Sequence, residues 1–369
     1  MTNSNLSGPG QDRMLSIDFF RGFTMFMLIG EFSGFFDRMM DPALSGTIIS
    51  AIGNQLHHVD WIGLHFWDLI QPFFMFIVGV AMPFSMTKRW NRGDSWNATL
   101  RHAAIRSLVL LVLGWYLYCI GPGKVTFRFT NVLAQLSVTY FIAFLLMKKA
   151  VKWQILASFL LILVSDILYR FWSIEGFNQP FTPDHNFGSW FDLALTGMPG
   201  GGHWVCFNAI PTTAHTIWGV IAGMILMNQW EPIKKFKILL FAGIIWVIAG
   251  YALSSFIPII KHICTSSFVI VSGGWSLIAL ALSYWIIDIM NFKKFTLFFA
   301  IVGMNPLFIY LFAHTNGGSW IGKIVKPIVQ TIFEYFSQFT VDIMLSAAVW
   351  AALWGICYFL YSRKVFIRL

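Results

Sequence analysis

Charged side chains are scarce in this chain. Lys, Arg, Asp and Glu make up 11% of its 369 residues, whereas 57% are hydrophobic and 18% are aromatic. A water-soluble globule could not bury so much apolar surface, while a lipid bilayer accepts it. Neither a soluble domain nor a low-complexity tract interrupts the sequence. We therefore expect an all-α, polytopic membrane helical bundle.

Apolar runs locate the expected helices. A bilayer core needs roughly 20 apolar residues per helix. Ten runs approach or reach this length: residues 15–36, 66–86, 104–120, 131–147, 153–171, 209–228, 238–257, 267–288, 295–313 and 341–361. The segment 320–339 is interrupted by Lys323, Lys326 and Glu334, so we expect an interfacial helix there.

The basic residues predict the orientation, because short cytoplasmic loops hold an excess of Lys and Arg. Both termini are then cytoplasmic, and His57 and His58 face the other side. The formal charge of +9 follows largely from this orientation, so we expect no nucleic-acid partner. Alternate connections carry the excess: Lys88, Arg89, Arg92, Arg101, Lys148, Lys149, Lys152, Lys234, Lys235, Lys237, Lys293, Lys294, Arg363, Lys364 and Arg368.

We expect one domain. Residues 1–12 are polar and predicted to be a disordered cytoplasmic segment, and residues 13–369 form the transmembrane domain. The long connection 172–208 is more often functional than idle at that size. Cysteine is also scarce. Cys119, Cys206 and Cys264 lie near the predicted outer face without metal-ligand spacing, so we expect buried free thiols and no metal.

Histidines and carboxylates gather just before the second apolar run. His57, His58, Asp60, His65 and Asp68 lie where water gives way to lipid, and charge is costly there. This arrangement suits proton transfer, although a lone interfacial histidine more often serves as a hydrogen-bonding group. Asp68 either orients a histidine or is a helix-start carboxylate. We take His58 as the candidate base.

Asp18 and Arg21 are three residues apart on the first predicted helix, so they share a face and can form an ion pair. Pairing offsets part of the about 2.5–3.5 kcal/mol that a charge costs at a helix centre. Two interpretations remain open. The pair holds an anionic ligand, or it lies at the interface and extends into water.

Uncharged polar residues recur within the apolar runs. Each alone is typical of a helix–helix contact worth about 1 kcal/mol. Together they indicate an internal cavity for a polar ligand. They are Asn131, Gln135, Asn208, Thr212, Thr213, His215, Thr265, Ser266, Ser267 and Asn305.

Several blocks, taken in order, carry a resemblance over nearly the whole chain. They are residues 16–22, His58 with Trp61, Gly63, Asp68, Pro72, Phe76 and Gly79, residues 132–140, residues 208–213 with Gly219 and Gly223, Lys261 with residues 265–269, and residues 303–307. This order resembles the transmembrane acyltransferase family that includes heparan-alpha-glucosaminide N-acetyltransferase and its bacterial relatives. The ten-helix membrane portion of that family agrees with the ten apolar runs.

The resemblance implies transfer of an acetyl group from cytosolic acetyl-CoA, a co-substrate, to the amine of an amino sugar on the far side. His58 matches the active-site histidine of the family. The implied setting is the inner membrane of a bacterium, with membrane lipid around the bundle and a homodimer left open. Two positions depart from the family pattern. Glu31 stands one residue from where relatives usually carry asparagine, and Gln135 replaces an arginine.

Coenzyme A is a polyanion that would approach from the cytoplasmic face, where Arg21, Arg101 and Arg106 lie. Its long pantetheine arm suits a polar-lined passage. The residues expected to bind it are Asp18, Arg21, Gln135, Ser266 and Asn305.

The predicted chemistry begins with the ammonium form of the acceptor, which must lose a proton before its nitrogen can attack a thioester. Imidazole has a suitable pKa, so His58 is the expected base, with Asp68 or Asp60 fixing its tautomer. An acetyl-imidazole intermediate on His58 is the other route. Two further functions stay open: an O-acyltransferase of an envelope glycan or lipid, and a transporter of small polar metabolites.

Overall fold

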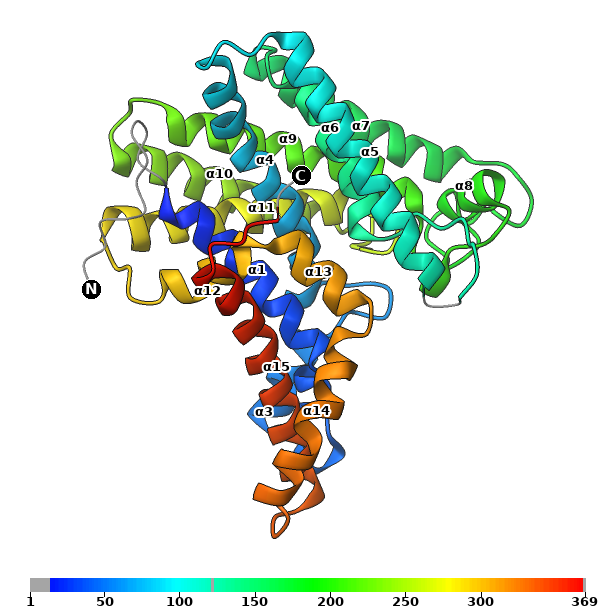
Figure 1. Cartoon of the computed structure of the whole chain (residues 1–369). Helices are drawn as coiled ribbons and strands as arrows, with labels where there is room; N and C mark the ends of the chain where they lie inside the picture. Colours follow the sequence, from blue (N-terminus) through cyan, green and yellow to red (C-terminus); the bar gives the residue numbers. More distant parts are fainter. Residues whose placement is uncertain (1–13, 121–122, 368–369) are drawn as a thin grey trace.

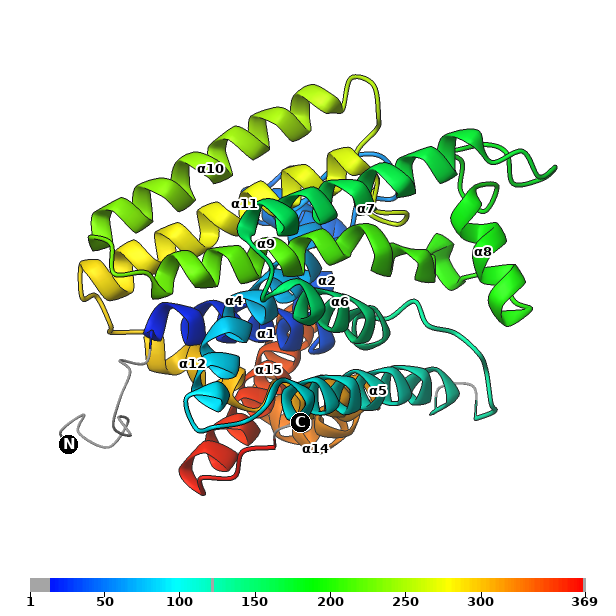
Figure 2. The same ribbon diagram turned by 90° about the horizontal axis from the view of Figure 1, so that it is seen from above.

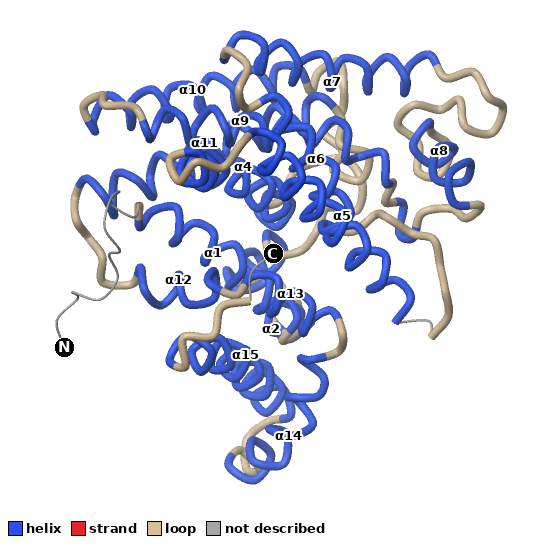
Figure 3. The backbone as a smooth tube through the Cα atoms, turned by 45° about the horizontal axis from the view of Figure 1, so that its top comes forward, coloured by secondary structure: helices blue, strands red, loops and turns tan. Residues whose placement is uncertain are grey.

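The structure is a computed structural model that describes residues 14–120 and 123–367. The segment 1–12, predicted to be disordered, lies outside the described residues. Within the described ranges every regular element is helical and no strand occurs (Figure 3). The predicted all-α class is confirmed.

The α-helices are α1 (Leu15–Phe32), α2 (Phe35–Arg38), α3 (Ile48–Gln55), α4 (Ile70–Trp90), α5 (Trp96–Ile120), α6 (Val132–Leu146), α7 (Val151–Phe171), α8 (Phe187–Thr196), α9 (Ala209–Met227), α10 (Pro232–Leu253), α11 (Ser266–Tyr284), α12 (Thr296–Met304), α13 (Pro306–His314), α14 (Gly317–Ile332) and α15 (Gln338–Ser362). Four 3-10 turns are η1 (Pro42–Leu44), η2 (Phe66–Leu69), η3 (Gly201–His203) and η4 (Cys206–Asn208). A π-helical turn, η5 (Trp285–Ile289), extends α11.

All ten predicted runs are helical. In the described ranges, seven helices are long and apolar enough to cross a membrane, or eight when the bent pair α12 and α13 counts as one span. The two remaining runs correspond to α6, which has 15 residues, and to α1, whose 18 residues include Asp18, Arg21 and Glu31. The chain is thus a multi-pass helical membrane protein.

The helices form two groups. In Figure 2, α7, α9, α10 and α11 lie side by side, with α4 packed against α9. The second group combines α1, α12 and α15, and α1 also contacts α4 and α11. Figure 1 shows α14 running beside α15 away from the first group. The helix predicted over 320–339 therefore begins earlier and ends at Ile332, because residues 333–337 turn the chain into α15. Its interfacial position stays a prediction.

The predicted run 295–313 is broken. α12 and α13 meet at 71° around Asn305 and Pro306. Proline fits the first turn of α13, where a backbone N–H has no helical partner. The Asn305 side chain forms hydrogen bonds with the segment that follows α15. Its Nδ2 donates to the Val365 carbonyl (3.0 Å), and its Oδ1 accepts from the Ile367 amide (2.8 Å).

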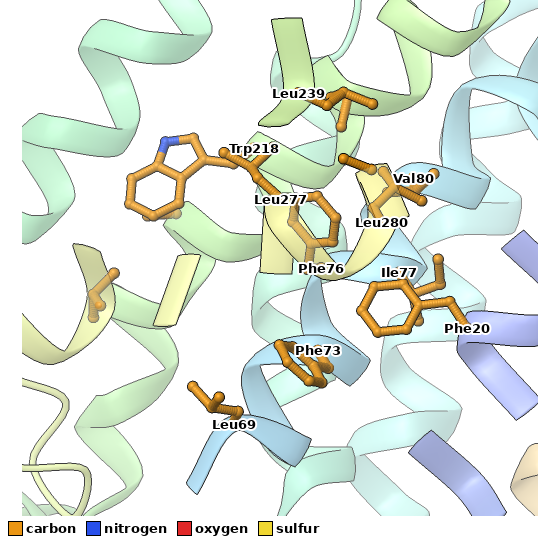
Figure 4. Close-up of a cluster of buried hydrophobic side chains, with 14 of the residues drawn as sticks. Phe20, Leu69, Phe73, Phe76, Ile77, Val80, Trp218, Leu239, Leu277 and Leu280 are labelled. Carbon is orange, nitrogen blue, oxygen red and sulfur yellow. The ribbon is translucent and has the colours of Figure 1, made fainter. Parts of the chain in front are cut away.

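The main apolar core lies between α4, α9 and α11. Phe76, Val80 and Leu280 are buried there near one another (Figure 4), and Trp218 of α9 is buried in the same cluster. Glycines let α4 and α9 approach closely. A methyl group on Gly219 would overlap the backbone oxygen of Phe76, and similar overlaps face Gly79 and Gly223. Small residues at such crossings are a common basis of helix packing in lipid.

Gly219→Ala should destabilise the protein, since the added methyl group must push α4 and α9 apart. Overpacking of this kind costs about 1–3 kcal/mol. Gly355→Ala is the matched control, because Gly355 is also inside a helix but has no atom within 4 Å of its Cβ position. Thermal unfolding in detergent should show a lower Tm for Gly219→Ala alone. Equal Tm values for the two variants would contradict the close crossing.

One end of the bundle holds His58, Asp68 and Lys261, and we call it the His58 end. The starts of α4, α6, α9 and α11 meet there, because Gln71 of α4 donates to Gln135 of α6 and Asn208 before α9 donates to the His262 carbonyl before α11 (2.6 Å). The opposite end joins the start of α1 to η5, where the Ser16 amide donates to Asp288 Oδ2 (3.3 Å).

The cysteines are all free, as predicted. Cys264 is buried, while Cys119 and Cys206 are only half-buried. Within residues 14–120 and 123–367, no cluster of three or more His, Cys, Asp or Glu side chains is placed to hold a metal ion.

Candidate active site

His58 lies between α3 and η2 and is tied to the helix that follows. Its Nδ1 is 2.7 Å from Asp68 Oδ1. The other carboxylate oxygen, Asp68 Oδ2, accepts from the backbone amides of His65 (2.9 Å) and Val59 (3.4 Å). Asp68 is buried. Both readings of Asp68 therefore apply, since it caps the start of a helix and also holds a histidine.

The Asp68 contact selects one tautomer of His58. An ionised carboxylate only accepts hydrogen bonds, so Nδ1 must carry the proton and donate it. The lone pair of the neutral ring then lies on Nε2, for which no hydrogen bond is found among the described residues. The side chain is 37% exposed. The ring is thus partly exposed, and Nε2 is its nitrogen with an unprotonated lone pair.

Lys261 adds a cation from a segment 203 residues away in sequence. Its Nζ lies 3.1 Å from His58 Nδ1 and 3.6 Å from Asp68 Oδ1. Because Nδ1 already carries a proton, the ammonium can donate only to the carboxylate. The Lys261 side chain is 6% exposed, so this charge is nearly removed from water.

The surroundings lower the pKa of His58 below its ordinary value of 6.5. Burial has the largest effect, the Lys261 ammonium adds to it, and Asp68 opposes both. His57 behaves differently. Burial alone would lower its pKa, but hydrogen bonds to the Gly53 carbonyl (2.8 Å) and to Asp37 (3.0 Å) outweigh burial and raise it. Of the two neighbouring rings, His58 is the one whose surroundings favour the neutral form.

The remaining candidates of this segment have other partners. His65 Nδ1 lies 3.0 Å from the His57 carbonyl, which fixes the loop. Asp60 is exposed and has no hydrogen bond to His58 in the described ranges. Asp68, rather than Asp60, is thus the carboxylate that contacts His58.

Aromatic rings enclose one side of His58. The Trp204 ring lies 5.5 Å from it and the Trp67 ring 6.4 Å, centroid to centroid. His262 packs 4.1 Å from Trp204 and 5.3 Å from Trp61. Burial lowers the pKa of His262 to about 4, so that ring is neutral. The site therefore combines one accessible imidazole with a largely apolar wall.

Asp18 and Arg21 form the predicted pair, with 2.7 Å between Asp18 Oδ1 and the guanidinium. They lie near the start of α1, at the end of the bundle opposite His58. The role of this pair toward a ligand stays a prediction.

Gln135, Ser266 and Asn305 lie apart from that pair. Gln135 and Ser266 are at the His58 end, where Ser266 Oγ donates to Asp166 Oδ1 (3.5 Å), and Asn305 lies at the α12–α13 bend. At 1.5 Å per helical residue, Ser266 is about 33 Å along α11 and η5 from Asp288. The five residues predicted to bind coenzyme A thus form no single cluster, and only an extended ligand could meet both ends.

Arg106 is a further cation inside the bundle. Its guanidinium lies 4.6 Å above the Tyr140 ring. Within the described residues, neither Arg106 Nε nor the buried Tyr140 hydroxyl has a hydrogen-bond partner, and Arg106 forms no ion pair. Arg101, five residues earlier on α5, is exposed. A cation without a counter-ion in an apolar helix is a common sign of an anionic ligand.

Sequence reasoning missed the roles of Lys261, Trp204 and His262 around His58. Lys261 belongs to one of the blocks that resemble the family. Its position on a connection poor in basic residues was the other feature that could have marked it as a site residue. Trp204 belongs to the long connection 172–208, whose size indicated a function without indicating which residue carries it.

The fold and this site define a multi-pass membrane protein with a histidine–aspartate pair at one end of its helices. No family model matches the chain. Over 92 residues it is 40% identical to heparan-alpha-glucosaminide N-acetyltransferase of Homo sapiens and 39% identical to that of Mus musculus. The matched stretch covers 23% of this chain and 14% of each relative. The similarity supports a relationship to that family.

Proposed function

We propose that the chain is a transmembrane acetyltransferase, which moves the acetyl group of cytosolic acetyl-CoA to the amine of a glucosamine-type sugar on the other side of the membrane. One observation carries this proposal: Asp68 holds the partly exposed His58 ring, and Nε2 of that ring has no hydrogen bond to any residue that the structure describes. The relatives support it, because their name describes an N-acetyltransferase acting on heparan-alpha-glucosaminide.

In the proposed reaction His58 Nε2 removes a proton from the attacking amine. The amine nitrogen bonds to the thioester carbon, the carbon–sulfur bond breaks, and coenzyme A leaves as its thiolate. Asp68 stabilises the imidazolium that forms, as carboxylates do in other histidine-based sites. The proton on Nε2 then passes to the departing thiolate, which restores the neutral ring.

The co-substrate would enter from the opposite end of the bundle. Its phosphates would meet Arg106 and the unpartnered Tyr140 hydroxyl, and the Asp18–Arg21 pair would lie at the entrance. The excess of Lys and Arg on alternate connections supports an orientation with this end and both termini cytoplasmic. We place the protein in a bacterial inner membrane, with residues 13–369 as one domain.

Detergent-purified protein should release coenzyme A when given acetyl-CoA and glucosamine, and coenzyme A alone should raise its Tm, because a ligand that binds only the folded state stabilises it. N-acetylglucosamine is the control acceptor, since its nitrogen is already acylated. Thiol titration and mass spectrometry measure the products.

The linkage in the product separates the acetyltransferase classes. An amide product resists hydroxylamine, whereas an O-acetyl ester is cleaved and would replace the amino-sugar proposal with O-acylation. Absence of both coenzyme A release and a Tm shift would contradict acyl transfer altogether.

A further inference from the structure

Lys261 has no part in the reaction described above, yet it is the cation nearest to His58. It approaches from the Nδ1 side of the ring, at 3.1 Å, and so does not face the reactive Nε2. Lys261 therefore lies away from the nitrogen at which the proton is transferred. Its effect on the reaction is exerted through His58 and Asp68.

The loop before α11 is built to hold Lys261 inward. Thr265 Oγ1 accepts from the Ile260 amide (3.0 Å) and donates to the Pro258 carbonyl (2.8 Å). The Cys264 amide donates to the Lys261 carbonyl (3.0 Å), and Cys264 has a positive φ of 49°. A non-glycine residue seldom adopts that conformation. These bonds close the loop around Lys261 and fix the direction of its side chain.

Charge balance follows from this placement. Buried Asp68 carries −1 and buried Lys261 carries +1, so the pair is neutral while His58 is neutral. Protonation of His58 would put a second cation beside the ammonium, and like charges at this distance disfavour it. Without Lys261, the Asp68 carboxylate alone would face the ring and favour its protonation.

We propose that Lys261 is a positioning residue whose ammonium neutralises Asp68 and opposes protonation of His58, which keeps Nε2 in its base form. This inference rests on the proposed function only for the role of His58 in transfer. The neighbouring groups fit it. His57 adds to the repulsion of a protonated His58, and Glu31 and Cys264 interact with Lys261. His203 and neutral His262 lie on the aromatic side.

The test measures the protonation of His58 without any acetyl transfer. Diethyl pyrocarbonate modifies an imidazole ring only in its neutral form. Peptide mass spectrometry at a series of pH values therefore gives the pH at which His58 modification is half-maximal, which we call its midpoint. We expect a midpoint below 6.5 in the wild type. Lys261→Met should raise it by about 1 pH unit, and Lys261→Arg should leave it unchanged. Lys323→Met, at an exposed position on α14, is the matched control.

Lys261→Gln serves if Lys261→Met does not fold, since its amide still donates to Asp68 without a charge. The acid limb of kcat/KM should move with the midpoint. A wild-type midpoint at or above 6.5, or an unchanged midpoint in a folded variant lacking the charge, would overturn the inference. If the protein is not an acetyltransferase, no coenzyme A is released. The pH midpoint of His58 modification does not depend on that activity, so it still tests the role of Lys261.

Discussion

His58→Ala is expected to lower kcat for acetyl transfer about 10³-fold, within the 10²–10⁴ that a general base contributes. The variant loses the ring whose Nδ1 is held by buried Asp68 and whose Nε2 has no hydrogen bond within the described part of the chain. Steady-state release of coenzyme A with glucosamine as acceptor measures the loss. The fold should survive, because the His58 side chain is 37% exposed and belongs to a loop.

His57→Ala is the control for that measurement, since His57 is adjacent but bonds to Asp37 and to the Gly53 carbonyl. It should retain most of the wild-type kcat. Comparable losses in both variants, or none in His58→Ala, would remove His58 from the mechanism.

The same enzyme can separate the two chemical routes. If His58 carries the acetyl group, incubation with acetyl-CoA and no acceptor should add one acetyl group to the His58 peptide, together with a burst of coenzyme A. Direct transfer gives neither. Both routes require an accessible Nε2, which is why His58→Ala does not distinguish them.

The helices were predictable because an apolar run in lipid must satisfy its backbone hydrogen bonds within the segment, which a helix does. All ten runs are helical. Their ends differ from the predicted ones, because local caps and turns determine where each helix begins and ends. The run 15–36 ends at Phe32, and α5 begins at Trp96, eight residues before the predicted 104. Pro306 is a local signal for a break in the run 295–313, but the partners of the Asn305 side chain, Val365 and Ile367, could not be predicted, because they lie about 60 residues away.

The candidate site was predictable only in part. His58 and Asp68 are ten residues apart, so a local pattern could bring both to attention. Lys261 could not be assigned in this way, since its contact with His58 depends on how α11 packs beside α4. Polar residues such as Ser266 and Asn305 were grouped by polarity alone, and polarity does not say which way a side chain points.

Asp68→Asn is expected to reduce kcat about 10³-fold, a loss as large as that of His58→Ala, because it changes the tautomer rather than the ring. The asparagine amide can donate to Nδ1, which would move the proton to Nε2 and remove the lone pair that accepts the substrate proton. The Lys261 ammonium would then face His58 with no opposing carboxylate. The pKa of His58 should fall further, so the ring stays neutral at lower pH.

Asp68→Asn should thus combine a low kcat with a neutral His58 ring, and this pair of results makes the prediction specific. A variant that fails only because its base is protonated recovers at high pH, whereas Asp68→Asn should stay inactive across the whole pH range, because its neutral ring has the proton on the wrong nitrogen. The pH profile of kcat and the diethyl pyrocarbonate midpoint of His58 measure the two effects together. Asp60→Asn, at an exposed carboxylate of the same loop, is the control and should behave as the wild type. Retention of most of the wild-type kcat by Asp68→Asn at neutral or alkaline pH would mean that Asp68 does not hold the tautomer of His58.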